Sequence, residues 1–149
     1  MNLTIGILNQ LPQKINQNLS NHIQTAIQQK IHHLIVLDDD PTGTQTVQNV
    51  PVLTHWSVEV LSQEMKAGSP IFYILTNSRA LPQAAAEKLA REIGQNIKTT
   101  SEQLNKKCMV ISRSDSTLRG HYPSEVEHLK TALGQKDAMN IIIPAFFEG

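Results

Sequence analysis

The sequence predicts an α/β domain, with helices on both sides of a mostly parallel sheet in a three-layer α/β/α arrangement. Short apolar runs, such as residues 34–37 and 71–75, alternate along the chain with segments whose apolar residues recur at helical spacing. Strands that are apolar throughout are typical of parallel sheets covered on both faces. Polar residues follow several of these runs directly, which is where ligands bind in open α/β sheets.

The chain opens with a predicted helix over residues 9–31. Its apolar residues are spaced by four and form one stripe, made of Ile15, Leu19, Ile23 and Ile27. Such a stripe is typical of a helix that packs on a domain. We therefore expect residues 1–31 to be an N-terminal helical extension and residues 32–149 to be the α/β domain.

The first predicted strand, residues 34–37, is followed by a second at residues 50–56. Pro51 lacks a backbone N–H and favours a strand start or an edge of the sheet. Ser57 is a candidate N-cap for the next helix, and Gly68 is a stop signal that ends it.

The second half of the chain repeats this alternation. An apolar strand at residues 71–75 precedes a helix that begins near Pro82. A strand at residues 108–111 precedes a helix that begins at Pro123, and residues 140–144 are predicted as a last apolar strand.

Composition excludes several classes of protein. The chain has 149 residues, about the length of one domain, with 13 basic and 13 acidic residues and a formal net charge of zero. This balance does not favour a nucleic-acid partner. A single cysteine rules out an internal disulfide and suits a reducing cytoplasm. No apolar run approaches the length of a membrane span, and no signal peptide is expected.

Three polar clusters, at residues 38–44, 76–79 and 112–120, follow predicted strands. If the strands are parallel, these clusters meet along one edge of the sheet. Arg79 and Arg119 lie in them, and each offers a planar guanidinium suited to a carboxylate or phosphate. The alternative for each arginine is an ion pair with a nearby aspartate.

The other residues of these clusters suit a ligand with hydroxyl groups. Asp39, Asp40 and Asp115 can accept hydroxyl protons or hold a hydrated Mg²⁺ ion. Ser116, Thr117 and the backbone of Gly120 can form short hydrogen bonds. Together with the arginines they suit a small anionic polyol. No Cys/His set has zinc spacing and no glycine-rich nucleotide motif is present, so no metal ligand is predicted in the chain.

Four stretches together resemble the four-carbon acid sugar kinase family, in the family's order and at suitable intervals. They are DDDPTGTQTV (38–47), LTNSR (75–79), SRSDSTLRGHYPSE (112–125) and IIIPAFFEG (141–149). Members of this family use ATP to phosphorylate small sugar acids of the threonate and erythronate type. The family pattern Asp-Asp-x-Thr-Gly falls on Asp39, Asp40, Thr42 and Gly43, and the resemblance covers about residues 32–149.

The resemblance implies roles for individual residues. We expect Asp39 and Asp40 to be catalytic. The expected substrate-binding residues lie in the first three motifs and are Thr42, Gly43, Ser78, Arg79, Asp115, Ser116, Thr117, Arg119 and Gly120.

The resemblance also implies a second, C-terminal nucleotide-binding domain as a partner. The chain ends partway through the last motif, so we expect this domain to be missing and the chain alone to lack kinase activity. ATP and Mg²⁺ are then cofactors of the full-length enzyme, held mostly outside this chain. The other expected partner is the small sugar acid, with no nucleic acid and no membrane, and a homo-oligomer is left open.

Two other functions are compatible with the sequence. A haloacid-dehalogenase-like phosphatase would use Asp38 as nucleophile, Asp40 as general acid/base and Thr76 in its second motif, with Mg²⁺ at the phosphate. That family needs a lysine and then an acidic pair after a later strand, where this chain has Arg113, Asp115 and Arg119. The second alternative is a non-catalytic sugar-acid-binding module.

Overall fold

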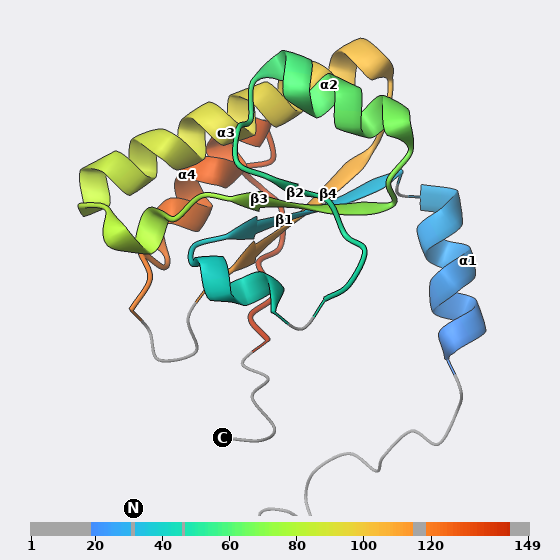
Figure 1. Ribbon diagram of the computed structural model, residues 1–149, viewed down its shortest axis with the longest axis horizontal. Coiled ribbons are helices and arrows are strands. Elements are labelled where there is room, and N and C mark those ends of the chain that lie inside the picture. The colour runs from blue at the N-terminus through green and yellow to red at the C-terminus, as the bar shows by residue number, and fades with distance from the viewer. Residues whose placement is uncertain (1–18, 31, 46, 115–118, 144–149) are drawn as a thin grey trace, which may run out of the picture.

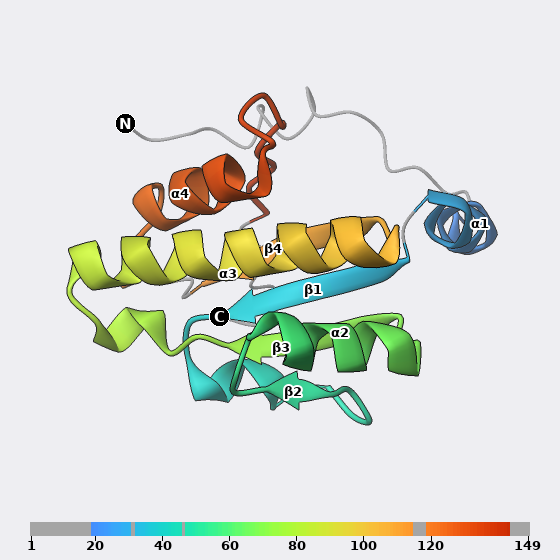
Figure 2. The same cartoon turned by 90° about the horizontal axis from the view of Figure 1, so that it is seen from above.

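The computed structural model of the protein describes residues 19–30, 32–45, 47–114 and 119–143. Its centre is a four-stranded sheet in the order β2-β3-β1-β4, and every pair of neighbours is parallel (Figures 1 and 2). The predicted α/β class and the parallel sheet are therefore confirmed.

β1, His33–Asp38, is the central strand and the most deeply buried one. It pairs with β3, Ile71–Leu75, on one side and with β4, Cys108–Arg113, on the other. β2, Val52–Leu53, lies at the sheet edge next to β3, as the proline at position 51 favours. The aliphatic run of β1 thus has a partner on each side, which satisfies its backbone groups within the sheet.

Three helices cover one face of the sheet: α2, Val58–Ala67; α3, Gln83–Leu104; and α4, Ser124–Leu133 (Figure 1). The predicted cap residues are confirmed, because the Ser57 side chain accepts from the Val60 N–H and Gly68 ends α2 with a φ of 86°. Between helices and sheet lies the core, which contains Ile35, Phe72 and Ile93 among its fully buried residues.

The other face of the sheet carries the 3-10 helix η2, Pro41–Thr44, and the chain that leads from it to β2 (Figure 1). In the sheet order β2-β3-β1-β4, the connection from β1 to β2 runs in one direction along the sheet, and the connections from β2 to β3 and from β3 to β4 run in the other. Right-handed crossovers therefore place this connection on the opposite face. The second layer of α-helices expected there is not found among the described residues, because this connection forms only η2. Met109 and Ile111 on this face are 48% and 43% exposed.

The strand predicted at residues 140–144 is not formed by residues 140–143, the part of it that the structure describes. Residues 140–143 are in neither strand nor helix, and the three isoleucines at 141–143 are 64–77% exposed. A strand needs a neighbour to accept its backbone hydrogen bonds, and no residue of the sheet pairs with this segment. Its apolar composition therefore does not make it part of the core.

The predicted N-terminal helix is confirmed for the part of residues 9–31 that the structure describes, except for Leu19 at its start. α1 spans Ser20–Lys30 and lies beyond the amino end of β1, apart from the other helices in both views (Figures 1 and 2). Residues 19–25 are all exposed, including Leu19 and Ile23 of the predicted stripe. The expectation that this stripe packs on the domain is therefore wrong for these residues, because helical spacing predicts a helix and not its partner.

None of the helices in the described part of the chain has the length and apolar character that crossing a membrane requires.

Candidate functional site

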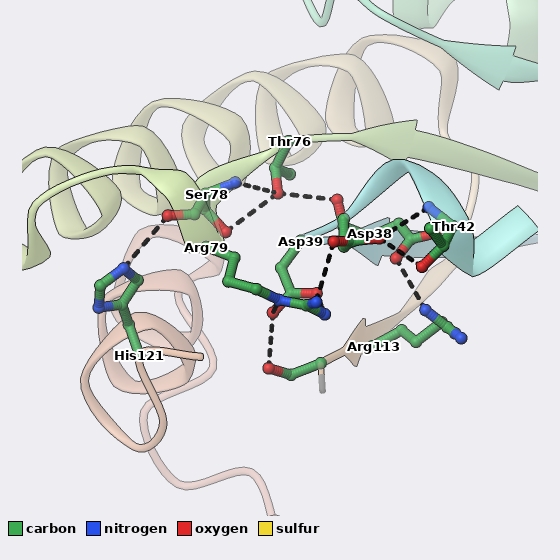
Figure 3. Close-up of polar contacts among 10 residues, drawn as sticks. Asp38, Asp39, Thr42, Thr76, Ser78, Arg79, Arg113 and His121 are labelled. Atoms are coloured by element: carbon green, nitrogen blue, oxygen red, sulfur yellow. Dashed lines mark hydrogen bonds and ion pairs between the residues drawn. The ribbon is translucent and has the colours of Figure 1, made fainter. Parts of the chain in front are cut away.

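The carboxyl ends of β1, β3 and β4 meet at one edge of the sheet, as the sequence predicts (Figure 3). The Thr76 N–H donates to the Asp38 carbonyl at 2.9 Å, and the Arg79 N–H donates to the Asp39 carbonyl at 3.3 Å. On the other side, the Asp39 N–H donates to the Arg113 carbonyl at 3.4 Å. These bonds continue the sheet past the strand ends and hold the three clusters together.

Arg79 joins the two aspartates that the sequence singles out. Its Nη2 lies 2.8 Å from Asp39 Oδ1, and its Nη1 lies 2.9 Å from Asp40 Oδ2 (Figure 3). Both bonds are charge-assisted and the arginine side chain is only 17% exposed. Of the two roles weighed for Arg79, the structure therefore forms the ion pair with aspartates.

Asp39 is enclosed by the site and does not project into solvent. It is 4% exposed, and in addition to Arg79 it accepts a hydrogen bond of 2.8 Å from the Ser114 hydroxyl. A Cβ built at Gly120 would overlap Ser114 Oγ and lie 3.1 Å from Asp39 Oδ2. Gly120 thus brings its backbone close to Asp39, which a larger residue could not do.

Asp40 is the more open of the pair, with a side chain 22% exposed. Its carboxylate caps η2 by accepting from the Thr42 hydroxyl and, at 2.7 Å, from the Thr42 N–H. These two bonds are the main reason why the pKa of Asp40 lies below its usual value; burial opposes them, and the charges of Arg79 and then Arg119 lower the pKa further. Arg119 therefore acts on the same edge as Asp40, and Asp40 is ionised and a weak base.

Asp38 turns to the face that carries η2. It is fully buried, and its Oδ1 lies 3.1 Å from Arg113 Nη1. Burial raises the pKa of Asp38, and the charge of Arg113 opposes this rise. A Cβ at Gly43 would overlap both side chains, so only a glycine fits this close to the pair; Asp38 has no exposed surface, whereas the Arg113 side chain is 42% exposed.

This packing decides against the phosphatase alternative. A nucleophilic carboxylate must reach the phosphorus of a bound ester. Asp38 lies beneath Gly43 and is bound to Arg113, so it cannot do so.

The cluster after β3 is organised by hydroxyl groups. Asn77 has a φ of 53°, a left-handed conformation that asparagine tolerates, and starts the 3-10 helix η3, Ser78–Ala80. The Thr76 hydroxyl bonds the Asp38 carbonyl at 2.9 Å and Ser78 Oγ at 3.1 Å, and His121 Nε2 lies 3.2 Å from the Ser78 carbonyl (Figure 3). Ser78 itself is fully buried.

The structure thus brings together most of the predicted site residues that it describes: Asp39, Asp40, Thr42, Ser78, Arg79, Arg119 and Gly120. Gly43 packs beside them on the Asp38 pair. The predicted residues Asp115, Ser116 and Thr117 lie outside the described residues. Sequence reasoning left Arg113, Ser114 and His121 out of the site. Their positions in the sequence could have indicated them, because Arg113 and Ser114 lie at the end of a predicted strand and His121 follows Gly120.

A hollow lies elsewhere, between α3 and α4, where Arg91, Lys98 and Thr131 are among its lining residues. None of the sheet-edge residues contributes to it. We place the candidate site at the sheet edge because buried charged groups converge there. No group of three His, Cys, Asp or Glu side chains able to hold a metal ion occurs within residues 19–30, 32–45, 47–114 and 119–143.

Comparison with known proteins gives one result. A family model described as the sugar-binding N-terminal domain matches residues 34–149, which include the whole sheet except His33 and all three clusters. No curated protein and no solved structure matches the chain.

Proposed function

The chain belongs to the sugar-binding N-terminal domain family, and from this we propose that it binds a four-carbon sugar acid at the carboxyl edge of its sheet. This domain occurs in four-carbon acid sugar kinases. We propose further that the chain is the substrate-binding part of such an ATP-dependent kinase. The observation that carries the proposal is the convergence of Asp40, Arg119 and the Asp39–Arg79 pair at one edge.

Each group has a role in this proposal. Arg119 is exposed and positively charged, and it binds the carboxylate of the sugar acid. Asp40 is ionised and partly exposed, so it accepts hydrogen bonds from hydroxyl groups of the ligand. Arg79 is held by both aspartates and acts as a positioning residue, because it fixes Asp39 and Asp40 relative to each other.

Phosphoryl transfer depends mostly on positioning and on electrostatic stabilisation. The roles of Asp39 and Asp40 therefore need not include full proton removal. Asp40, with its lowered pKa, suits the alignment of a hydroxyl group better than its deprotonation.

Two observations support a site for ATP and Mg²⁺ outside this chain. Both aspartates after β1 are bound by Arg79, which leaves no free carboxylate pair for a hydrated magnesium ion. The sequence also lacks the glycine-rich phosphate motifs. We propose that the nucleotide is held by a second domain of the complete kinase.

Calorimetry with threonate and erythronate tests the binding proposal. We expect at least one of the two acids to bind. The neutral polyols threitol and erythritol should bind at least ten-fold more weakly, because they lack the carboxylate that forms a charge-assisted bond to Arg119, worth about 1.5–3 kcal/mol. Arg119→Ala should lose a similar factor. Arg91→Ala, an exposed arginine on α3, is the matched control and should bind as the wild type does.

The same titrations would contradict the proposal if no sugar acid bound, or if the acid and the neutral polyol bound equally. Tight binding of ATP by this chain alone would contradict the assignment of the nucleotide to another domain.

A further inference from the structure

His121 joins the cluster after β3 to the chain that leads from β4 into α4. Its Nε2 lies 3.2 Å from the Ser78 carbonyl oxygen (Figure 3). Because a carbonyl oxygen only accepts, Nε2 carries the ring proton and donates it. The same oxygen also accepts from the Leu81 N–H at 2.9 Å, which its two lone pairs allow. The bond therefore fixes the tautomer of His121 and ties its ring to η3.

This bond connects the two halves of the proposed site. On one side, η3 carries Arg79, whose guanidinium lies 2.9 Å from the Asp40 carboxylate. On the other side, His121 ends the segment 119–121, which begins with Arg119. The position of Arg119 relative to Asp40 thus depends on how this segment is attached to η3.

The segment 119–121 has two further contacts, and neither of them points toward η3. Gly120 packs against Ser114, since a Cβ built at Gly120 would overlap Ser114 Oγ. The His121 carbonyl accepts from the Glu125 N–H at 3.0 Å, near the start of α4. The first is a packing contact without direction, and the second leads into the helix. The ring of His121 supplies a directed bond toward η3.

We propose that His121 is a positioning residue of the sugar-acid site and helps to set its preference for the length of the ligand. By tying the segment 119–121 to η3, it holds Arg119 at the distance from Asp40 that a four-carbon acid spans between its carboxylate and a hydroxyl group. This inference rests on the proposed function. No contact between His121 and the ligand is required, and Figure 3 shows the second ring nitrogen, Nδ1, turned away from Asp39.

Glutamine and asparagine separate the hydrogen bond from the bulk of the side chain. Both amides carry donor hydrogens, but that of glutamine reaches about as far as Nε2 and that of asparagine only as far as Nδ1. His121→Gln should therefore keep the bond to the Ser78 carbonyl, and His121→Asn and His121→Ala should lose it. His128→Ala is the matched control, because His128 Nδ1 also bonds a backbone carbonyl, that of Ser124 at 2.8 Å, but within α4.

Calorimetry with sugar acids of three, four and five carbons tests the preference. Glycerate, threonate, erythronate and arabinonate are each titrated into the wild type and the variants. We expect the wild type, His121→Gln and His128→Ala to bind at least one four-carbon acid more tightly than glycerate and arabinonate.

The variants that lose the bond should lose this preference. His121→Ala and His121→Asn should bind the four-carbon acid about three- to ten-fold more weakly than the wild type, as expected for the loss of one neutral hydrogen bond. Their affinity for glycerate should change by less than about two-fold, because glycerate is too short to span Arg119 and Asp40. A general loss of structure would instead weaken the binding of every acid.

The ring nitrogens of His121 provide a second measurement, which needs neither a ligand nor a variant and so decides even if a variant fails to fold. In a ¹⁵N-labelled sample at about pH 9, where free imidazole is neutral, the ¹⁵N chemical shifts distinguish the protonated from the unprotonated ring nitrogen. We expect the proton of His121 on Nε2. A proton on Nδ1 would leave the Ser78 carbonyl without a donor from this ring and would overturn the inference.

The titrations also separate this inference from the proposed function. Equal affinities of the wild type for acids of all three lengths would overturn the inference. A His121→Asn variant that binds as His121→Gln does, or a His128→Ala variant that loses the preference, would overturn it too. In each of these cases, binding of a sugar acid by the wild type leaves the proposed function intact. Absence of any binding by the wild type would overturn the proposed function and this inference with it.

Discussion

Arg79 and Arg113 each neutralise carboxylates at the edge of the sheet, but the surroundings of the two pairs differ. Arg79 is mostly buried and holds Asp39 and Asp40, whereas Arg113 is 42% exposed and holds the fully buried Asp38. The sequence predicts three aspartates at the end of a strand. It does not predict that Asp38 points to the opposite face from the helices, because that depends on the register of β1 against β4.

The Asp38 pair gives a prediction on stability. Arg113→Met removes the cation from a buried carboxylate, so it should lower the free energy of unfolding by about 2–3 kcal/mol at neutral pH. Since the carboxyl pKa is raised in the folded state, the stability it contributes is present at acid pH and is lost as the pH rises. The deficit of the variant should therefore shrink as the pH falls through the raised pKa of Asp38, which lies higher still when Arg113 is absent. Urea denaturation at several pH values measures it.

Arg91→Met is the control for this experiment. Arg91 is 48% exposed and lies 3.6 Å from Glu87, so its loss should change stability by no more than about 0.5 kcal/mol. An Arg113→Met variant as stable as Arg91→Met at neutral pH would show that Asp38 needs no counter-charge.

At the scale of elements, α3 and α4 pack closely because α3 has a glycine at the contact. A Cβ at Gly94 would lie 2.7 Å from the Cβ of Ala132 and 3.1 Å from the Leu129 carbonyl oxygen. The backbone of α4 cannot yield locally, so a side chain there must push the helices apart. The consequence reaches the site, since α4 follows Gly120 and His121, and His121 Nε2 lies 3.2 Å from the Ser78 carbonyl.

Gly94→Val should therefore destabilise the protein by about 2 kcal/mol or more, in spite of any gain from the loss of a flexible glycine. Gln95→Val is the matched control, because Gln95 is the next residue of α3 and is exposed. It should cost about 0.5 kcal/mol through helix propensity alone. Equal melting temperatures for the two variants would contradict the close contact.

The segment after α4 gives a second test at this scale. Ile142 is 64% exposed, so Ile142→Asp should change the stability by about 0.5 kcal/mol or less. The buried Ile74→Ala is the positive control, with an expected loss of about 2–5 kcal/mol. A large loss for Ile142→Asp would show that residues 140–143 pack as the sequence predicts and not as the structure has them.

At the scale of the whole molecule, the sequence predicts the class of fold and the edge that carries the site. The apolar runs of β1, β3 and β4 are long enough to identify strands, and the polar residues after them mark the ends of those strands. The order β2-β3-β1-β4 follows from pairings over long distances in the chain, which local patterns do not contain. The same limit explains why Ile142 and Ile23 are exposed although they were predicted to pack. An apolar side chain does not show whether another element is present to cover it.

The site is predictable to a similar degree. Residue types place Asp39, Asp40, Arg79 and Arg119 at one edge, and the structure agrees. That Arg79 is held by Asp39 and Asp40 depends on the turn at Asn77, where the left-handed residue directs Arg79 back toward β1. Such a turn is decided by the tertiary structure, so the sequence leaves both roles open for each arginine.

The most direct test of a sugar-acid site at this edge is a map of amide chemical shifts in an isotope-labelled sample titrated with threonate and with erythronate. We predict that the largest shifts fall on Asp40, Arg79, Ser114 and Gly120, at the carboxyl ends of the strands. The amides of Ser69 and Lys107, near the opposite ends of the strands, and those of Lys98 and Thr131, in the hollow between α3 and α4, should not move. Shifts concentrated in that hollow or at the amino ends of the strands would contradict the account.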